Sequence, residues 1–415
     1  MTSAALRQNN RLDVVQWRVL LLLVFSIFIN YIDRGNLSVA APMLRTELHL
    51  NQEQMGRLLS AFFWTYAVCQ VIGGWAVDKF NVKIVFGVGF MIWSLATACT
   101  GLVHTFATLF AFRLLLGIGE SVSYPSYSKV LAGNFTERHR GLANGMIDAG
   151  SKCGPALGTF IGATIVGHYG WRVLFLGLGF GCLIWLPPWF VWGPRNESAG
   201  VRAAHDGPGY AEILGKRDAW GTFIGLFGGN YVWYFLLTWL PGYLVEERGF
   251  TMEEMAVLGA LPFLGIAATA MLGGILSDRW IMRGGGVTTV RKTFVVAGLL
   301  LFNLMLPVPL IKNHTIAMSL MMAASLCFGF YSSNLWAITQ ALAGPSAAGK
   351  WTGLQNGIGN LAGVVAPMLT GMAVYRTGSF FLGFLAASVM AVMAAASFGF
   401  IVREVKPVTW RSKTA

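Results

Sequence analysis

Charged residues are scarce in this chain: only 12% of its 415 residues are Asp, Glu, Lys or Arg, whereas 55% are hydrophobic. Because an average globular protein carries about 25% charged residues, this composition excludes an ordinary soluble domain. The five cysteines lie in apolar segments without a paired spacing, so we expect small core residues. The six histidines are scattered and form no metal-ligand pattern. We therefore expect neither a bound metal nor a cofactor.

Signatures of nucleotide-binding and hydrolytic enzymes are missing as well. The triplet at 284–286 is Gly-Gly-Gly, but no Gly-Lys-Ser/Thr ending of a phosphate-binding loop follows it. Ser121 and Ser123 lie outside any nucleophile-elbow pattern and have no histidine near them in sequence. The sequence therefore predicts a protein that is not an enzyme.

Long apolar runs, in contrast, recur from end to end, and each is long enough to cross about 30 Å of hydrocarbon. The first is too long and too polar in its second half for a cleaved signal, and no small-residue cleavage site follows it. We predict an all-α membrane protein with twelve transmembrane helices. The predicted spans lie near 17–41, 56–77, 83–103, 108–130, 141–166, 171–192, 219–244, 254–277, 291–311, 315–342, 351–374 and 379–402.

The net charge of +12 orients these spans and gives no support to a nucleic-acid partner. With the N-terminus inside, most of the 30 Lys and Arg residues fall on cytoplasmic ends and loops. The opposite side receives only Arg45, Arg57, Arg172, Arg248, Lys312 and Arg376. This is the positive-inside bias, which predicts that both termini and the central loop are cytoplasmic.

The spans divide into two halves that repeat. The segment GGWAVDK, which ends at Lys79, has a counterpart GGILSDR that ends at Arg279, an offset of 200. GLANG at 141–145 matches GLQNG at 353–357, an offset of 212 that also places Asp148 on Asn360. Glycines recur in any helix-packing interface. Packing alone, however, does not account for an acid followed by a base at matched positions of the two halves, Asp78-Lys79 and Asp278-Arg279.

Each match preserves the direction of its span, so the halves are parallel repeats, with a substrate site expected between them near the midplane. We predict two six-helix bundles, 1–192 and 219–415, joined by a cytoplasmic loop at 193–218.

Six charged residues lie inside the apolar spans, where a charge at the centre of a helix costs about 2.5–3.5 kcal/mol. Three are acids and three are bases, as mutual pairing requires. Such residues normally face a bundle interior or a water-filled cavity. The six are Asp33, Arg34, Arg113, Glu120, Asp148 and Lys152.

Arg34 and Arg113 are candidates for holding an organic anion, because arginine stays protonated and grips carboxylates with two hydrogen bonds. Glu120 lies two helical turns after Arg113, hence on the same face, while Asp33 lies about 100° round the helix from Arg34. A carboxylate whose arginine partner is intermittently captured by substrate can take and lose a proton, a role that suits Asp33 and Glu120. Static salt bridges that only fix helix packing are the alternative.

Asp148 and Lys152 are four residues apart and can pair with each other on one helix face. An internal pair and a substrate contact fit this spacing equally well. An extra cation beside a cavity favours a substrate with a second negative group, such as a dicarboxylate or a phosphorylated acid.

The second half offers neutral polar side chains rather than charges deep within its spans. Any one of them is more often a helix-packing hydrogen bond than a ligand contact. Trp336 and Asn360 are the preferred candidates, with Tyr31 and Tyr66 in the first half. The polar side chains of the second half are Asn230, Tyr231, Tyr234, Ser333, Asn334, Trp336, Asn356 and Asn360.

Several segments resemble known transporters. GGWAVDKFNVK and GGILSDRW resemble the loop signature of the major facilitator superfamily. NYIDRGNLSVAAP, FRLLLGIGESVSYPS, NYVWYFLLTWLPGYLVEERGF and TGLQNGIGNLAGVVAPMLTG are similar to the anion:cation symporters, which include bacterial galactonate, hexuronate and glucarate permeases, sialin and the vesicular glutamate transporters.

The resemblance implies the major facilitator fold, proton coupling at Asp33 and Glu120, and anion binding at the intramembrane arginines. It also implies a polar sugar contact near Ser151, from which Lys152 departs. By the same resemblance, four residues at the cytoplasmic span ends form charge contacts that hold the outward-open state and release on switching. Those gating candidates are Asp78, Lys79, Asp278 and Arg279. Solvated loop turns oriented by positive charges are the alternative.

We therefore expect a secondary transporter that imports an organic anion together with protons by alternating access, most plausibly a sugar acid such as an aldonate, hexuronate or aldarate. Its partners are the anion, protons and the lipid bilayer, and we expect a monomer in a bacterial inner membrane. An anion exchanger of the sugar-phosphate type and a transporter-like ligand sensor are the alternatives.

Overall fold

The computed structural model describes residues 12–50, 52–194 and 207–410, and every regular element in these ranges is a helix. The prediction of an all-α protein is confirmed. The first half contains α2 (Val14–Glu47), α3 (Gln52–Lys79), α4 (Val82–Thr100), α5 (Phe106–Glu120), α6 (Ser123–Asn134), α7 (Glu137–Cys182) and α8 (Leu186–Trp192). After the short α9 (Tyr210–Leu214) follow α10 (Arg217–Gly242), α11 (Met252–Met282), α12 (Val287–Leu301), α13 (His314–Asn360), α14 (Ala362–Thr377) and α15 (Phe381–Ala396).

Two glycines with positive φ divide the longest helices. Gly170 has φ 82° and ψ 164° within α7, and Gly344 has φ 64° and ψ 175° within α13. Only glycine adopts this backbone without strain, so the chain turns sharply at both places. Each of these long helices therefore contains one predicted span and the first part of the next.

Nine helical segments among the described residues are long and apolar enough to cross a membrane, and one of them, His314–Val374, covers two predicted spans. The predicted spans at 56–77 and 141–166 are not among the nine. These two pass through the contact between the halves, where glycines and polar side chains such as Gln70 and Asn144 replace large apolar residues.

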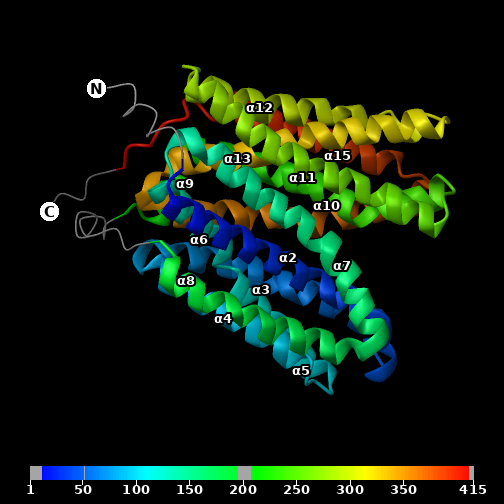
Figure 1. Ribbon diagram of the computed structural model, residues 1–415. Coiled ribbons are helices and arrows are strands. Elements are labelled where there is room, and N and C mark those ends of the chain that lie inside the picture. The colour runs from blue at the N-terminus through cyan, green and yellow to red at the C-terminus, as the bar shows by residue number, and fades with distance from the viewer. Residues whose placement is uncertain (1–11, 51, 195–206, 411–415) are drawn as a thin grey trace.

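The helices form two groups, α2–α8 and α10–α15, which lie against each other at one end and diverge toward the other (Figure 1). Where they meet, α3 packs on α13 and α7 packs on α11. Gly74 has no room for a Cβ because the carbonyl of Gly349 lies against it, and Gly274 is closed in the same way by Gly141. Small residues let the two backbones approach this closely.

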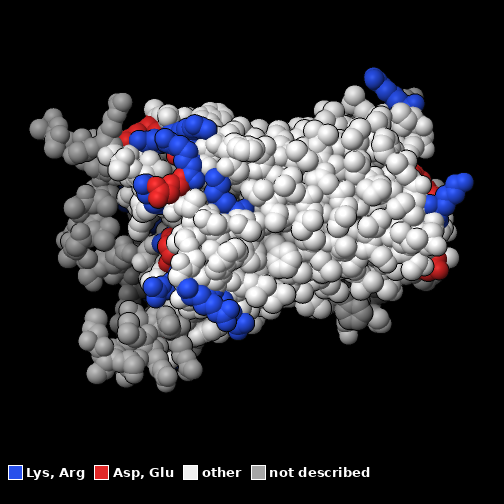
Figure 2. Space-filling view, turned by 90° about the horizontal axis from the view of Figure 1, so that it is seen from above, with Lys and Arg blue, Asp and Glu red and all other residues white. Residues whose placement is uncertain are grey.

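Charged side chains concentrate at the two ends of the molecule and leave an uncharged band between them (Figure 2). Most basic residues gather at the end where α2 begins and where the described chain ends. Six of the basic residues that the orientation argument assigns to the cytoplasmic side lie outside the described residues, as does the side chain of Arg45; the six are Arg7, Arg11, Arg195, Arg202, Arg411 and Lys413.

Candidate functional site

A polar cavity of about 50 Å³ lies between the two halves. By this measure a water molecule needs roughly 10–15 Å³, so the closed cavity has room for a few waters and must widen before a six-carbon acid fits. Its first-half lining is Tyr31, Arg34, Tyr66, Tyr124, Asp148 and Lys152. Its second-half lining is Leu226, Gly229, Asn230, Trp233, Tyr234, Phe328, Tyr331, Ser332, Leu335, Trp336, Asn356 and Asn360.

Arg34 is the cation on the α2 side of this cavity. Its Nε donates to Oε2 of Glu120 at 2.9 Å, and the Glu120 side chain is fully buried. The guanidinium lies over the rings of Tyr31 and Tyr66, 4.7 Å and 4.5 Å from their centroids. Arg34 Nη2 and Glu120 Oε1 have no hydrogen-bond partner among the described residues. The pair therefore keeps unused donor and acceptor capacity beside the cavity.

Glu120 is the last residue of α5, and the helix is interrupted directly after it at Ser121 and Val122. Pro125 explains the interruption, because proline has no N–H to donate to the carbonyl of the residue four positions earlier, which is Ser121. The chain resumes as α6 and brings Tyr124 to the cavity. A local break in the fourth span thus positions both an acid and an aromatic side chain.

Asp33 and Arg113 lie behind the cavity, inside the first half. They are 2% and 5% exposed, and neither lines the cavity. Asp33 Oδ1 accepts a long 3.4 Å hydrogen bond from Asn36, and Oδ2 has no partner among the described residues. The Arg113 guanidinium lies 5.6 Å from the ring centroid of Phe62, which Arg34 also approaches, at 4.9 Å. Arg34 is therefore the link between this buried charge cluster and the cavity.

Asp148 and Lys152 form the second charged pair on the cavity wall. Lys152 Nζ is 3.4 Å from Asp148 Oδ1 and 3.6 Å from the ring centroid of Trp233. The other carboxylate oxygen of Asp148 accepts a 2.7 Å hydrogen bond from Ser332 of α13. This pair thus contacts both α10 and α13 across the boundary between the halves.

Neutral groups complete the cavity on the second-half side. Tyr234 donates to Oδ1 of Asn360 at 2.7 Å, and Asn360 Nδ2 donates to Asn356. Trp336 lies 5.2 Å from the ring of Tyr124, whose hydroxyl is 3.2 Å from that of Tyr31. Hydroxyl and amide groups therefore face the arginine side across the cavity.

The structure brings most of the sequence-predicted site residues to the cavity. Tyr31, Arg34, Tyr66, Asp148, Lys152, Trp336 and Asn360 line it, whereas Asp33, Arg113, Glu120 and Ser151 do not. Ser151 is fully buried and donates to the carbonyl of Asp148.

Sequence reasoning missed Trp233 and Ser332, although helical periodicity pointed to them. Ser332 lies four residues before Trp336, and Trp233 lies three after Asn230, so each shares a helix face with a candidate already chosen. The residues chosen instead, Ser333 and Asn334, are fully buried on another face of α13.

The two halves meet through two aspartates, each of which accepts from two consecutive backbone N–H groups of the other half. Asp278 accepts from Gly141 and Leu142, and Asp78 accepts from Gly349 and Lys350. The sequence repeat aligns Gly141 with Gly353, but these contacts match it with Gly349, one helical turn earlier. Both glycines then lie four residues after the first residue of their helical segment, Glu137 or Pro345.

Lys129 and Arg291 are the cations bound to these aspartates. Lys129 lies 3.2 Å from Asp78, and Arg291, fully buried, lies 2.7 Å from Asp278. Arg291 also donates to Ser277, Asn334 and the carbonyl of Glu137.

The adjacent bases Lys79 and Arg279, predicted for this role, are exposed instead. Lys79 lies over the ring of Trp75 on its own helix. A residue next to an aspartate points about 100° away from it round the helix, so it faces a different neighbour.

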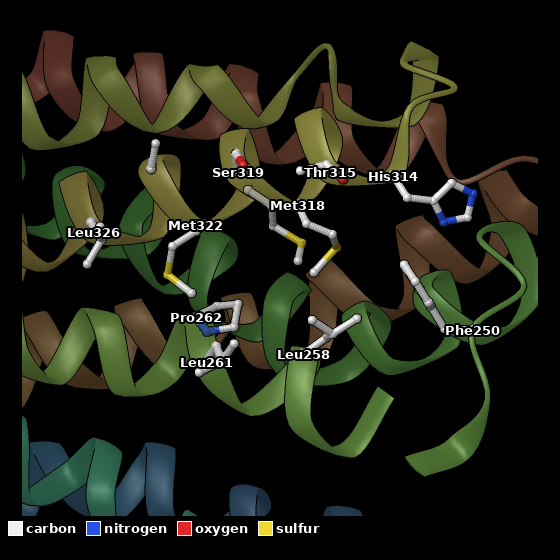
Figure 3. Close-up of a pocket in the computed structure, with 12 residues that line it drawn as sticks. Phe250, Leu258, Leu261, Pro262, His314, Thr315, Met318, Ser319, Met322 and Leu326 are labelled. Carbon is white, nitrogen blue, oxygen red and sulfur yellow. The ribbon is translucent and has the colours of Figure 1, made fainter. Parts of the chain in front are cut away.

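A larger, apolar groove of about 600 Å³ runs between α11 and α13 (Figure 3). Met318, Met322, Leu258 and Leu261 line it, and His314 and Phe250 lie at one end (Figure 3). No arginine or lysine is among the described residues that line it. A desolvated carboxylate needs a cation or several donors, so this groove is unsuited to an anion.

The fold is that of one class of protein: a multi-pass membrane transporter built from two helical halves. A family model described as Major Facilitator Superfamily matches residues 23–367. The chain belongs to the major facilitator superfamily. This confirms the predicted family and fold.

Curated relatives of similar length are transporters. The probable sulfoacetate transporter SauU of Cupriavidus necator is 34% identical, with 86% of this chain and 87% of the relative covered. The probable galactarate/D-glucarate transporter GarP of Escherichia coli is 30% identical, with 94% and 96% covered. The probable L-galactonate transporter of E. coli is 29% identical, with 96% and 92% covered. Transport rather than catalysis is therefore confirmed.

Among solved structures, the proton:xylose symporter XylE bound to 6-bromo-6-deoxy-D-glucose matches with a TM-score of 0.72 and 15% identity. The match covers 94% of this chain and 96% of that one. At this identity the likeness concerns the fold alone.

Proposed function

We propose that the protein imports a small organic anion of the sugar-acid class together with protons, by alternating access. The observation that carries the proposal is the Arg34–Glu120 contact. Arg34 faces the cavity, whereas its partner Glu120 is buried away from it. An anion that binds Arg34 competes with Glu120 for the same cation.

Competition for Arg34 couples anion binding to protonation. A carboxylate in an apolar interior is unstable without a cation or hydrogen-bond donors, so Glu120 takes up a proton when substrate captures Arg34. Anion and proton then occupy the site together, which is symport. Asp33 lies in the same buried cluster and is the second candidate for a proton.

The neutral wall of the cavity favours a hydroxylated substrate. Relatives are named for galactonate and galactarate or glucarate, which are polyhydroxylated, and for sulfoacetate, which has no hydroxyl group. Asn360, Tyr234 and Asn356 offer donors and acceptors to hydroxyls opposite Arg34. This arrangement supports a sugar acid over a small sulfonate.

Alternating access is supported by the two ends of the molecule. The halves are joined at the cytoplasmic end through Asp78 and Asp278 and diverge at the other (Figure 1). We propose that these contacts release when the site opens inward. The moving units are residues 1–192 and 219–415.

The basic end of the molecule (Figure 2) supports a bacterial inner-membrane protein with both termini in the cytoplasm. Anion exchange of the sugar-phosphate type is the alternative function. A direct bond between the cavity arginine and a buried acid favours symport over exchange, because exchange needs no coupling acid.

The test uses proteoliposomes that contain a pH-sensitive dye, with the membrane potential clamped. Adding galactonate outside should acidify the interior as labelled galactonate accumulates. Galactitol, the neutral polyol of the same carbon chain, is the matched control and should change nothing. Uptake of labelled galactonate without acidification would refute proton coupling, and absence of both uptake and binding would refute a sugar-acid substrate.

A further inference from the structure

Two cation–acid pairs adjoin the cavity, and they differ in how firmly the cation is held. Arg34 donates a 2.9 Å hydrogen bond to Glu120. Lys152 approaches Asp148 only to 3.4 Å, longer than the 2.7–2.9 Å typical of charge-assisted hydrogen bonds. The structure gives Lys152 no other hydrogen bond among the described residues. Its ammonium is therefore a loosely held cation on a cavity wall.

The surroundings of Lys152 are suited to a ligand rather than to packing alone. The ring of Trp233 stabilises the ammonium at 3.6 Å and leaves its other side toward the cavity. Asp148 does not depend on Lys152, because Ser332 donates to its other oxygen at 2.7 Å. A buried ion pair that served only packing would be no more stable than apolar residues of the same volume.

We propose that Lys152 is a second anion-binding group, so that the preferred substrate is a sugar diacid. This inference rests on the proposed function. One carboxylate binds Arg34 and the other replaces Asp148 beside Lys152, while the hydroxylated chain between them lies against Tyr124 and Asn360. Asp148, held by Ser332, is the resident counter-charge that the second carboxylate displaces.

Lys152 and Asp148 should have opposite effects on diacid binding when each is replaced. Removing the cation with Lys152→Gln should weaken diacid binding, because the second carboxylate loses its partner. Removing the acid with Asp148→Asn should strengthen diacid binding, because the competitor for Lys152 is gone. A purely structural ion pair predicts the same direction for both variants.

Galactarate and galactonate are matched probes, since they share a six-carbon polyol chain and differ by one terminal carboxylate. Binding to purified full-length protein is measured by calorimetry. Wild type should bind galactarate about tenfold to a hundredfold more tightly, the range expected for one hydrogen-bonded charge. Lys152→Gln should abolish that preference, while Lys152→Arg should retain it, which guards against a variant that fails to fold.

Three results would overturn the inference. They are equal binding of both acids by wild type, equal weakening of both acids by Lys152→Gln, and a shift of the preference in one direction by both variants. In each case galactonate binding and transport persist, so the proposed function stands. If wild type binds neither acid, the proposed function fails together with the inference.

Discussion

The two halves place their buried charges at different depths. In the first half, Arg34, Glu120, Asp148 and Lys152 lie at or beside the central cavity. In the second, the buried charged residues among those described are Asp218, Asp278 and Arg291, all at the end where α10 and α12 begin. Among the described residues, the first half alone thus carries buried charge at the central cavity, whereas both halves carry charge where they meet, the first through Asp78 and Lys129. The cavity charge belongs to one repeat of the fold, and closure is shared by both.

The largest expected effect is the loss of Arg34. Arg34→Gln removes one of the two cavity cations and leaves Glu120 buried and unpaired, which costs about 3–5 kcal/mol. Uptake of galactonate into proteoliposomes should fall by about a hundredfold or more. Arg172→Gln is the control, because Arg172 pairs with Glu47 outside the site. An equal loss of galactonate uptake in both variants would contradict a special role for Arg34.

Closure should depend more on Asp278 than on Asp78. Arg291 is fully buried beside Asp278, whereas Lys129 beside Asp78 is 20% exposed, so Asp278→Asn leaves the less solvated cation without its acid. We expect about 1.5–3 kcal/mol of lost stability at Asp278 and about 1 kcal/mol or less at Asp78.

Thermal unfolding measures the difference between the two closure variants. Labelling of a cysteine at Ser128, which lines a small cavity beneath the site, measures cytoplasmic opening. Each variant would be made without the five native cysteines. Equal effects of the two substitutions would contradict the asymmetry.

Removing a neutral second-half group should have a moderate effect. Asn360→Ala deletes an amide that accepts from Tyr234, so affinity for galactonate should fall by about three- to tenfold, the worth of one neutral hydrogen bond. Asn303→Ala, which affects only hydrogen bonds to Leu299 and Leu300, is the control and should bind normally. A loss as large as that of Arg34→Gln would erase the contrast between the halves.

The smallest effect concerns pH and the end of the first half at which α2 finishes. Hydrogen bonds from Arg172 and Trp171 lower the pKa of Glu47, which ends α2 beyond the membrane-spanning part. A lowered folded-state pKa means stability that is present above the unfolded pKa and lost as pH falls through the folded one. Glu47→Gln should therefore cost about 1 kcal/mol or less at neutral pH. In thermal unfolding, the difference from wild type should vanish in acid; a constant difference would contradict the ion pair.

The sequence predicted the fold and most of the residues that line the cavity, because hydropathy patterns and internal repeats are properties of the order of residues along the chain. Spans, their parallel repeat, and Arg34, Trp336 and Asn360 followed from spacing and resemblance. The partner of Glu120 did not follow. Spacing placed it on one face with Arg113, whereas the structure bonds it to Arg34 on another helix.

Contacts between helices depend on rotation and tilt, which local patterns leave open. Helix rotation and tilt therefore decide that Lys129 and Arg291, rather than Lys79 and Arg279, contact the two aspartates where the halves meet. They also explain why Asp148 meets Ser332 as well as Lys152.

The central claim is that the substrate anion and the buried Glu120 carboxylate compete for Arg34. This competition couples proton uptake to anion binding. Glu120→Gln keeps the shape of the side chain and removes its titration. In proteoliposomes the variant should still exchange labelled for unlabelled galactonate, but it should not accumulate galactonate against its gradient when a proton gradient is imposed. Uphill accumulation at the wild-type level would contradict the account.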